Sequence, residues 1–236
     1  MTRPVINDLF WIVGLLLQCG LVALVFLRGL ARRLPAFATL VAFYTLRSAA
    51  LFALFGHVSN ETYAAIYDVL SILDLLLQLL VAAEIAVALV RAAGGWSSRF
   101  GRLLLMLPVI AIAATLGLSR ILPSNTQVRP DRMQLFDWLV LILLGLATLT
   151  QTRAARRISE RPRLLAQGFA LYSVTGLCVT VARTFAALHH DAHRLAEWSY
   201  TLPTAWIVVV LYWISALKRP IPSASQSAET GVAAPA

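Results

Sequence analysis

The strongest constraint on the fold is a series of seven apolar stretches, because each supplies the roughly 20 residues that a helix needs to cross about 30 Å of hydrocarbon, or comes close to it. The chain has 236 residues, of which 59% are hydrophobic and 13% are charged, too apolar a composition for a soluble domain of this size. Backbone groups in lipid need partners within the protein, and these stretches lack the alternating polarity of a barrel. The sequence therefore predicts an all-α, polytopic seven-transmembrane-helix bundle. The predicted spans are Leu9 to Leu27, Ala36 to Gly56, Thr62 to Val90, Leu103 to Leu118, Leu135 to Thr152, Leu164 to Leu188 and Thr201 to Leu217.

The predicted domain organisation is simple. Residues 1–219 form the membrane domain, and residues 220–236, rich in Ser, Ala and Pro without periodicity, form a disordered cytoplasmic tail with no output domain. The first stretch is not expected to be a cleaved signal peptide, because Asn7 and Asp8 precede it and its basic cluster follows it.

Basic residues predict the orientation, because Lys and Arg are retained on the cytoplasmic side of a membrane. Thirteen of the 20 fall in the segments after spans one, three, five and seven, and five fall on the opposite side. The N-terminus is therefore expected outside and the C-terminus in the cytoplasm of a bacterial cell, with the chain in the inner membrane. Anionic lipid headgroups are the expected partners of this scattered charge of +9, and nucleic acid is not.

A short internal echo suggests a 3+1+3 pseudo-repeat, two parallel three-helix units joined by the fourth span. That span fits a lipid-exposed connecting role, since Thr115 is its only polar side chain. Matches at a single offset also arise by chance in a chain so rich in Leu and Ala, so both readings stay open. The echo pairs Phe52, Ala53, His57 and Tyr67 with Phe185, Ala186, His190 and Tyr200 at identical spacings.

The third span carries charges that a purely lipid-facing helix would lack, since a charge at the bilayer centre costs roughly 2.5–3.5 kcal/mol. Its polar side chains form a stripe on one helical face, with Asp68 and Glu84 on the flanks of that stripe. Arg47 lies in the second span, and counting equal distances from the intervening turn places it at the depth of Asp74. An Arg47–Asp74 ion pair is therefore predicted. The stripe consists of Tyr63, Tyr67, Ser71, Asp74 and Gln78.

The sixth span repeats this theme, with Gly176 allowing close backbone approach and Arg183 needing a partner, either Asp68 or Asp137. Polar side chains also expected to point inward are those of Gln18, Gln151 and Gln167, and of Tyr44 beside Arg47. Two readings of all these groups remain: a ligand or ion pathway, or ion pairs that only fix the bundle. The candidate pathway residues are Arg47, Tyr67, Asp68, Ser71, Asp74, Gln78, Glu84, Tyr172 and Arg183.

The four histidines fall at or beyond the outer ends of the second and sixth spans, where nearby carboxylates would help them to bind zinc or copper. A solvated surface is the alternative. These histidines are His57, His189, His190 and His193. Five tryptophans are assigned to interfacial aromatic belts: Trp11, Trp138 and Trp198 outside, and Trp96 and Trp213 inside.

No catalytic, nucleotide-binding or cofactor motif is present, so the chain is not expected to be an enzyme or to carry a cofactor. The first functional hypothesis is a small-solute transporter or an ion- or proton-coupled carrier. The second is a membrane sensor that signals to a cytoplasmic partner protein through its Arg-rich third cytoplasmic loop. The third is an outward-facing, metal-dependent membrane enzyme.

Overall fold

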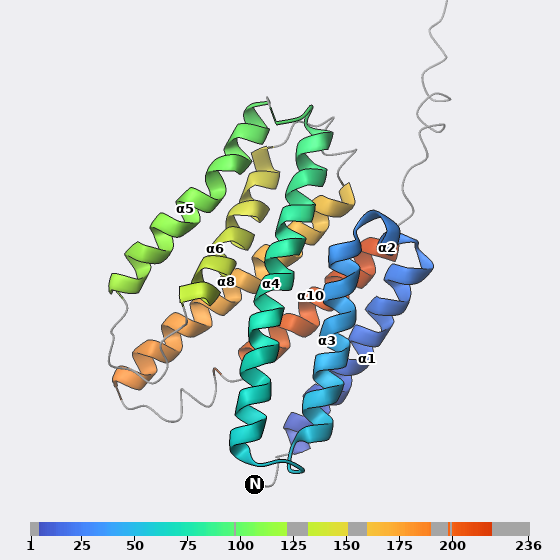
Figure 1. Ribbon diagram of the computed structural model, residues 1–236, viewed down its shortest axis with the longest axis vertical. Coiled ribbons are helices and arrows are strands. Elements are labelled where there is room, and N and C mark those ends of the chain that lie inside the picture. The colour runs from blue at the N-terminus through green and yellow to red at the C-terminus, as the bar shows by residue number, and fades with distance from the viewer. Residues whose placement is uncertain are drawn as a thin grey trace, which may run out of the picture.

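The computed structural model describes residues 5–96, 98–121, 132–150, 160–189, 198 and 200–218, and the regular elements in this part of the chain are all helices (Figure 1). The predicted all-α class is thereby confirmed. The helices begin and end within a few residues of the predicted spans, except that the predicted end of the fifth span, Thr152, lies outside the described residues. The elements are α1 (Val5–Leu27), α2 (Leu30–Arg33), α3 (Pro35–Leu54), α4 (Asn60–Ala92), α5 (Arg99–Ile121), α6 (Arg132–Ala147), the 3-10 helix η1 (Thr148–Thr150), α8 (Glu160–Leu188) and α10 (Thr201–Lys218).

Six of these helices, namely α1, α3, α4, α5, α8 and α10, are long and apolar enough to cross a membrane. The fifth predicted span corresponds to α6 and η1, a shorter apolar segment over Gln134–Thr150. The chain therefore has the architecture of a multi-pass membrane protein, and helix length supports six crossings and leaves the seventh open. The predicted tail at 220–236 lies outside the described residues.

The longest helix is α4, whose 33 residues begin where the Ser59 side chain accepts a hydrogen bond from the backbone N–H of Thr62 at 3.2 Å. Such a cap satisfies one of the N–H groups that have no partner within the helix. At about 1.5 Å per residue the helix is about 50 Å long, which exceeds a hydrocarbon core of about 30 Å. If α4 crosses a membrane, at least one of its ends extends beyond the lipid tails.

Helix α3 contacts α1 and α4, and we call these three helices the first group. Helix α8 contacts α6 and α10, and we call these three the second group. The groups meet where α4 contacts α6 and α8, and where α10 contacts α1. Helix α5 lies at one edge of the bundle, mainly against α6 (Figure 1), and exposes large apolar side chains such as Leu105, Met106 and Val109. The lipid-exposed connecting role expected for the fourth span stays a prediction, because α1 is even less buried than α5.

Aromatic side chains form the centre of the apolar core. The Trp213 ring lies 5.4 Å from Phe37 and 4.7 Å from Phe169, centroid to centroid, and joins α10 to α3 and α8. A Cβ atom at Gly168 would come within 2.8 Å of the Trp213 indole, so glycine at this position lets the indole pack against the backbone of α8. Trp213 is 0% exposed as a result.

The close approach predicted at Gly176 is present, and Trp138 of α6 fills the space. A Cβ atom on Gly176 would lie 2.8 Å from the Trp138 ring, which is 4% exposed. The assignment of Trp138 and Trp213 to interfacial belts is therefore wrong. Position along a span indicates depth in the membrane, but it does not indicate whether a side chain faces lipid or the core.

Candidate functional site

A polar cluster joins the middle of α3 to the middle of α4, and we call it the polar centre: Arg47, Ser71, Asp74 and Gln78. Arg47 Nη1 lies 2.5 Å from Asp74 Oδ2, and Arg47 Nη2 donates a hydrogen bond to Ser71 Oγ at 3.0 Å. Gln78 Nε2 donates to the other Asp74 oxygen at 2.8 Å. The ion pair expected from the sequence is present, and the stripe on α4 faces α3.

Two tyrosines complete the surroundings of this ion pair. The Arg47 guanidinium lies over the Tyr67 ring, 5.3 Å from its centroid, an arrangement in which the ring attracts the cation. The Tyr44 hydroxyl interacts with the Asp74 carboxylate from the α3 side. The side chains of Arg47 and Asp74 are only 15% and 17% exposed, so nearly all of their polar contacts are with the protein.

An aromatic layer lies next to the polar centre. Trp206 of α10 packs edge-on against Tyr44 at 4.8 Å and against Tyr172 of α8 at 5.3 Å, centroid to centroid. With its amide oriented to satisfy all three neighbours, Gln18 accepts a hydrogen bond from Trp206 Nε1 at 2.9 Å and donates to the Tyr44 carbonyl at 3.2 Å and to Ser48 Oγ at 3.1 Å. Trp206 thus connects four helices at the polar centre.

A cavity of about 380 Å³ opens between the first half of α1 and the start of α10. Trp206 and Gln18 both line this α1–α10 cavity. Trp206 also contacts Tyr44, which interacts with Asp74, so the aromatic layer links the cavity to the polar centre. The other lining residues are Phe10, Trp11, Gly14, Leu15, Ser48, Tyr200, Pro203 and Ile207.

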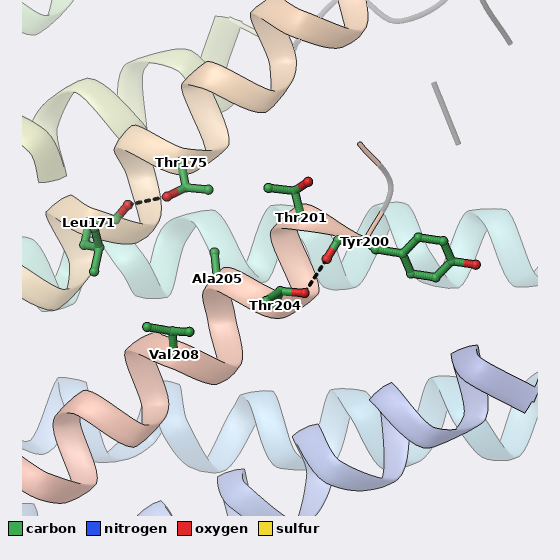
Figure 2. Close-up of a pocket in the computed structure, with 7 residues that line it drawn as sticks. All are labelled: Leu171, Thr175, Tyr200, Thr201, Thr204, Ala205 and Val208. Carbon is green, nitrogen blue, oxygen red and sulfur yellow. Dashed lines mark hydrogen bonds between the residues drawn. The ribbon is translucent and has the colours of Figure 1, made fainter. Parts of the chain in front are cut away.

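A second cavity, of about 400 Å³, lies between α8 and α10 (Figure 2). Figure 2 shows the Thr175 hydroxyl donating to the Leu171 carbonyl of α8 and the Thr204 hydroxyl donating to the Tyr200 carbonyl just before α10. The donor–acceptor distances are 3.0 Å and 2.8 Å. None of the seven lining residues carries a charge, and Leu171 and Val208 are exposed apolar side chains. This groove therefore offers little to a polar solute. Its lining is Leu171, Thr175, Tyr200, Thr201, Thr204, Ala205 and Val208.

Glu84, expected on the pathway, binds the backbone at the start of α3. Its two carboxylate oxygens accept hydrogen bonds from the N–H groups of Ala36 and Phe37, each at 3.0 Å. The first N–H groups of a helix have no partner within the helix, and the helix dipole favours a negative charge there. Glu84 therefore acts as a cap that fastens α4 to α3.

Replacing Glu84 with Ala is expected to lower the free energy of unfolding by about 2–3 kcal/mol, because two partly buried N–H groups lose their acceptor. Glu84→Gln retains an acceptor without the charge and should cost about 1 kcal/mol. Thermal unfolding of the purified protein in detergent measures both values. The control is Glu61→Ala, at an exposed carboxylate in the first turn of α4. An unchanged melting temperature for Glu84→Ala, combined with lost activity, would instead place Glu84 in the pathway.

Two predicted site residues lie apart from the polar centre. Asp68 is exposed on α4, and Arg183 of α8 forms no ion pair with any residue that the structure describes. The expected pairing of Arg183 with Asp68 or Asp137 is thus not formed. The Arg183 Nε atom is buried without a hydrogen-bond partner. The spacing of residues in the sequence indicates on which face of its helix each side chain lies. It does not indicate the tilt of α8 relative to α4, which packing sets and which decides whether the two side chains meet.

The expected glutamine and histidine contacts are partly visible. Gln167 accepts a hydrogen bond from the Tyr212 hydroxyl and donates to Thr148 Oγ1, both at 3.4 Å.

His57 and His189 are exposed near the ends of α3 and α8. Within the described ranges no three His, Cys, Asp or Glu residues are grouped as metal ligands would be. The remaining predicted residues, Gln151, His190 and His193, lie outside the described part of the chain.

Sequence reasoning missed two features of the site. Trp206 was given no role, although it forms the aromatic layer, and Asp137 was considered only as a partner for Arg183. Asp137 is 2% exposed and its Oδ1 atom has no hydrogen-bond partner. The sequence does contain an indication that Asp137 is unusual, because it is the sole acidic residue in the predicted fifth span.

No protein-family model, curated protein or solved structure matches this chain.

Proposed function

We propose that this protein is a transporter of a small polar solute or ion in the inner membrane, coupled to the movement of protons or other ions. The observation that carries the proposal is the Arg47–Asp74 ion pair in the middle of the bundle, surrounded by hydrogen-bonding side chains and adjacent to the α1–α10 cavity. Charged groups at such a depth are costly and commonly mark the pathway of a substrate or ion.

The helix packing supports this proposal. The two three-helix groups have corresponding contacts: α1 with α3 and α3 with α4 in one, α6 with α8 and α8 with α10 in the other. Contacts of α4 with α6 and of α10 with α1 join the groups. In this proposal α6 and η1 form the seventh crossing, α5 links two repeats, and the substrate binds where the repeats meet, as in many carriers.

The residues of the site come from both groups, as a binding site between two repeats requires. Arg47, Tyr44 and Asp74 belong to the first group, while Tyr172 and Trp206 belong to the second. A rocking movement between the groups would change the contacts of Trp206 with Tyr44 and so open or close the path from the α1–α10 cavity. With the N-terminus outside, the cavity faces the exterior, since it lies at the N-terminal ends of α1 and α10.

Currents recorded from proteoliposomes on a solid-supported membrane test this function. Concentration jumps of amino acids, sugars, amines, carboxylates and alkali-metal ions should produce a current for one class. Asp74→Asn should reduce that current about tenfold or more, equivalent to a loss of about 1.4 kcal/mol of binding free energy. Asp68→Asn, at the exposed acid of the same helix, should leave the current unchanged.

Two outcomes would contradict this proposal, the first its site and the second transport itself. Equal currents from the wild type and Asp74→Asn would remove the polar centre from the pathway. Ligand binding by thermal shift, together with a cytoplasmic partner recovered by cross-linking and no current, would favour the sensor.

A further inference from the structure

Asp137 is a second buried carboxylate at the polar centre. It lies on α6 next to Trp138, whose contact with Gly176 holds α6 against α8. The side chain is 2% exposed, and Oδ1 has no hydrogen-bond partner. Burying a carboxylate oxygen without a partner is unfavourable while the carboxyl carries its charge.

The charged and titratable groups around Asp137 leave it without a counter-ion in the described structure. Helix α6 packs against α4 and α8, and Asp74, Tyr172 and Tyr44 lie close enough to Asp137 to interact with its charge. Arg47 already pairs with Asp74. The charged residues of α5 lie in its first and last turns, and η1 has none. Arg183, near the outer end of α8, forms no ion pair with Asp137.

One cation therefore faces two carboxylates, and the described part of the site would carry a net charge of −1 if both were ionised. A proton on Asp137 removes this imbalance and leaves the Arg47–Asp74 pair neutral as a whole. A bare metal ion fits less well, because it needs several oxygen ligands and the Asp74 oxygens are already bound by Arg47 and Gln78.

We propose that Asp137 binds a proton at Oδ1 in the resting protein and exchanges it for an organic ammonium cation. The exchange rests on the proposed function, whereas the proton site does not. When the proton leaves, one negative charge appears at the site, and the incoming cation neutralises it. The rings of Tyr44, Tyr172 and Trp206 suit an organic cation in particular, because aromatic faces attract ammonium groups.

Infrared difference spectroscopy of the protein in nanodiscs, between neutral and alkaline buffer, tests the proton site, because exposed carboxyls stay ionised over this range. The C=O stretch of a neutral carboxylic acid is expected in the wild type and in the control Asp68→Asn, and it should vanish in Asp137→Asn. In Asp74→Asn the band should weaken, because Arg47 loses its carboxylate partner and its charge then favours the ionised form of Asp137. Asp137→Glu should restore a shifted band, which keeps the test decisive if Asp137→Asn folds poorly. A band that survives in Asp137→Asn, or its absence from the wild type at every pH, would overturn the site.

Proton release measured with a pH-indicator dye tests the exchange. Tetraethylammonium chloride should release protons from the wild type and none from Asp137→Asn, while sorbitol should release none from either. If the infrared band of Asp137 is present but tetraethylammonium releases no protons, the proposed exchange and its substrate class are wrong. Release without any solute-evoked current would instead refute transport and leave the proton site standing.

Discussion

Arg47→Gln or Asp74→Asn alone is expected to lower the free energy of unfolding by about 3–5 kcal/mol, because either change leaves the other charge without its counter-ion inside the bundle. The double variant should lose less than either single variant, since both charges are gone and an amide pair can still exchange a hydrogen bond. The predicted non-additivity follows from the direct contact of the two side chains.

Unfolding in mixed detergent and SDS micelles, followed by circular dichroism, provides the four free energies of this double-mutant cycle. Asp68→Asn and Arg91→Gln are matched controls on α4, at exposed positions, and should stay within about 0.5 kcal/mol of the wild type. If the double variant is no more stable than the single variants, the two charges do not stabilise the protein as a pair. The polar centre would then need another explanation.

The sequence was sufficient to predict this ion pair because α3 and α4 are neighbours joined by a short turn. Equal counts from the turn give equal depths, and the polar stripe on α4 shows which face turns toward α3. Helix boundaries were equally accessible, since polar and charged residues flank each apolar stretch. The close helix approach at Gly176 was also predictable, because a small residue between larger ones marks close helix packing in membranes.

The aromatic layer was not accessible in this way. Trp206 and Tyr172 meet Tyr44 through helices that are far apart in the sequence, so no local count places them together. Lipid and protein core are both apolar, so a span that is hydrophobic on all sides hides the face that packs inward. Trp138 and Trp213 were misassigned for the same reason, since an interfacial and a buried tryptophan can occur at the same position along a span.

The acids of α4 show a further limit of sequence patterns. Asp68 is exposed, Asp74 pairs with Arg47, and Glu84 caps α3. All three were expected on one pathway because each is costly in lipid. That cost shows that a charge needs a partner, but it does not say whether the partner is a side chain, a helix end or water.

Trp206→Ala is the second variant with a large expected effect, a loss of about 3–5 kcal/mol in the free energy of unfolding. Alanine removes the ring contacts with Tyr44, Tyr172 and Trp213 and leaves the Gln18 oxygen without its donor. Trp206→Phe keeps a ring but loses the N–H group, so it should cost about 1–3 kcal/mol. The exposed Trp96 supplies the control, and Trp96→Ala should change stability little.

The same substitution should also join the α1–α10 cavity to the polar centre, because the Trp206 side chain both lines the cavity and packs against the ring of Tyr44, which interacts with Asp74. Proteoliposomes containing folded Trp206→Ala are therefore expected to lose an imposed pH gradient faster than those containing the wild type or Trp96→Ala, as a trapped pH-sensitive dye would report. Trp206→Phe should fall between them. A gradient that decays equally in all four preparations, with Trp206→Ala shown to be folded by circular dichroism, would mean that Trp206 packs the core without separating the cavity from Asp74.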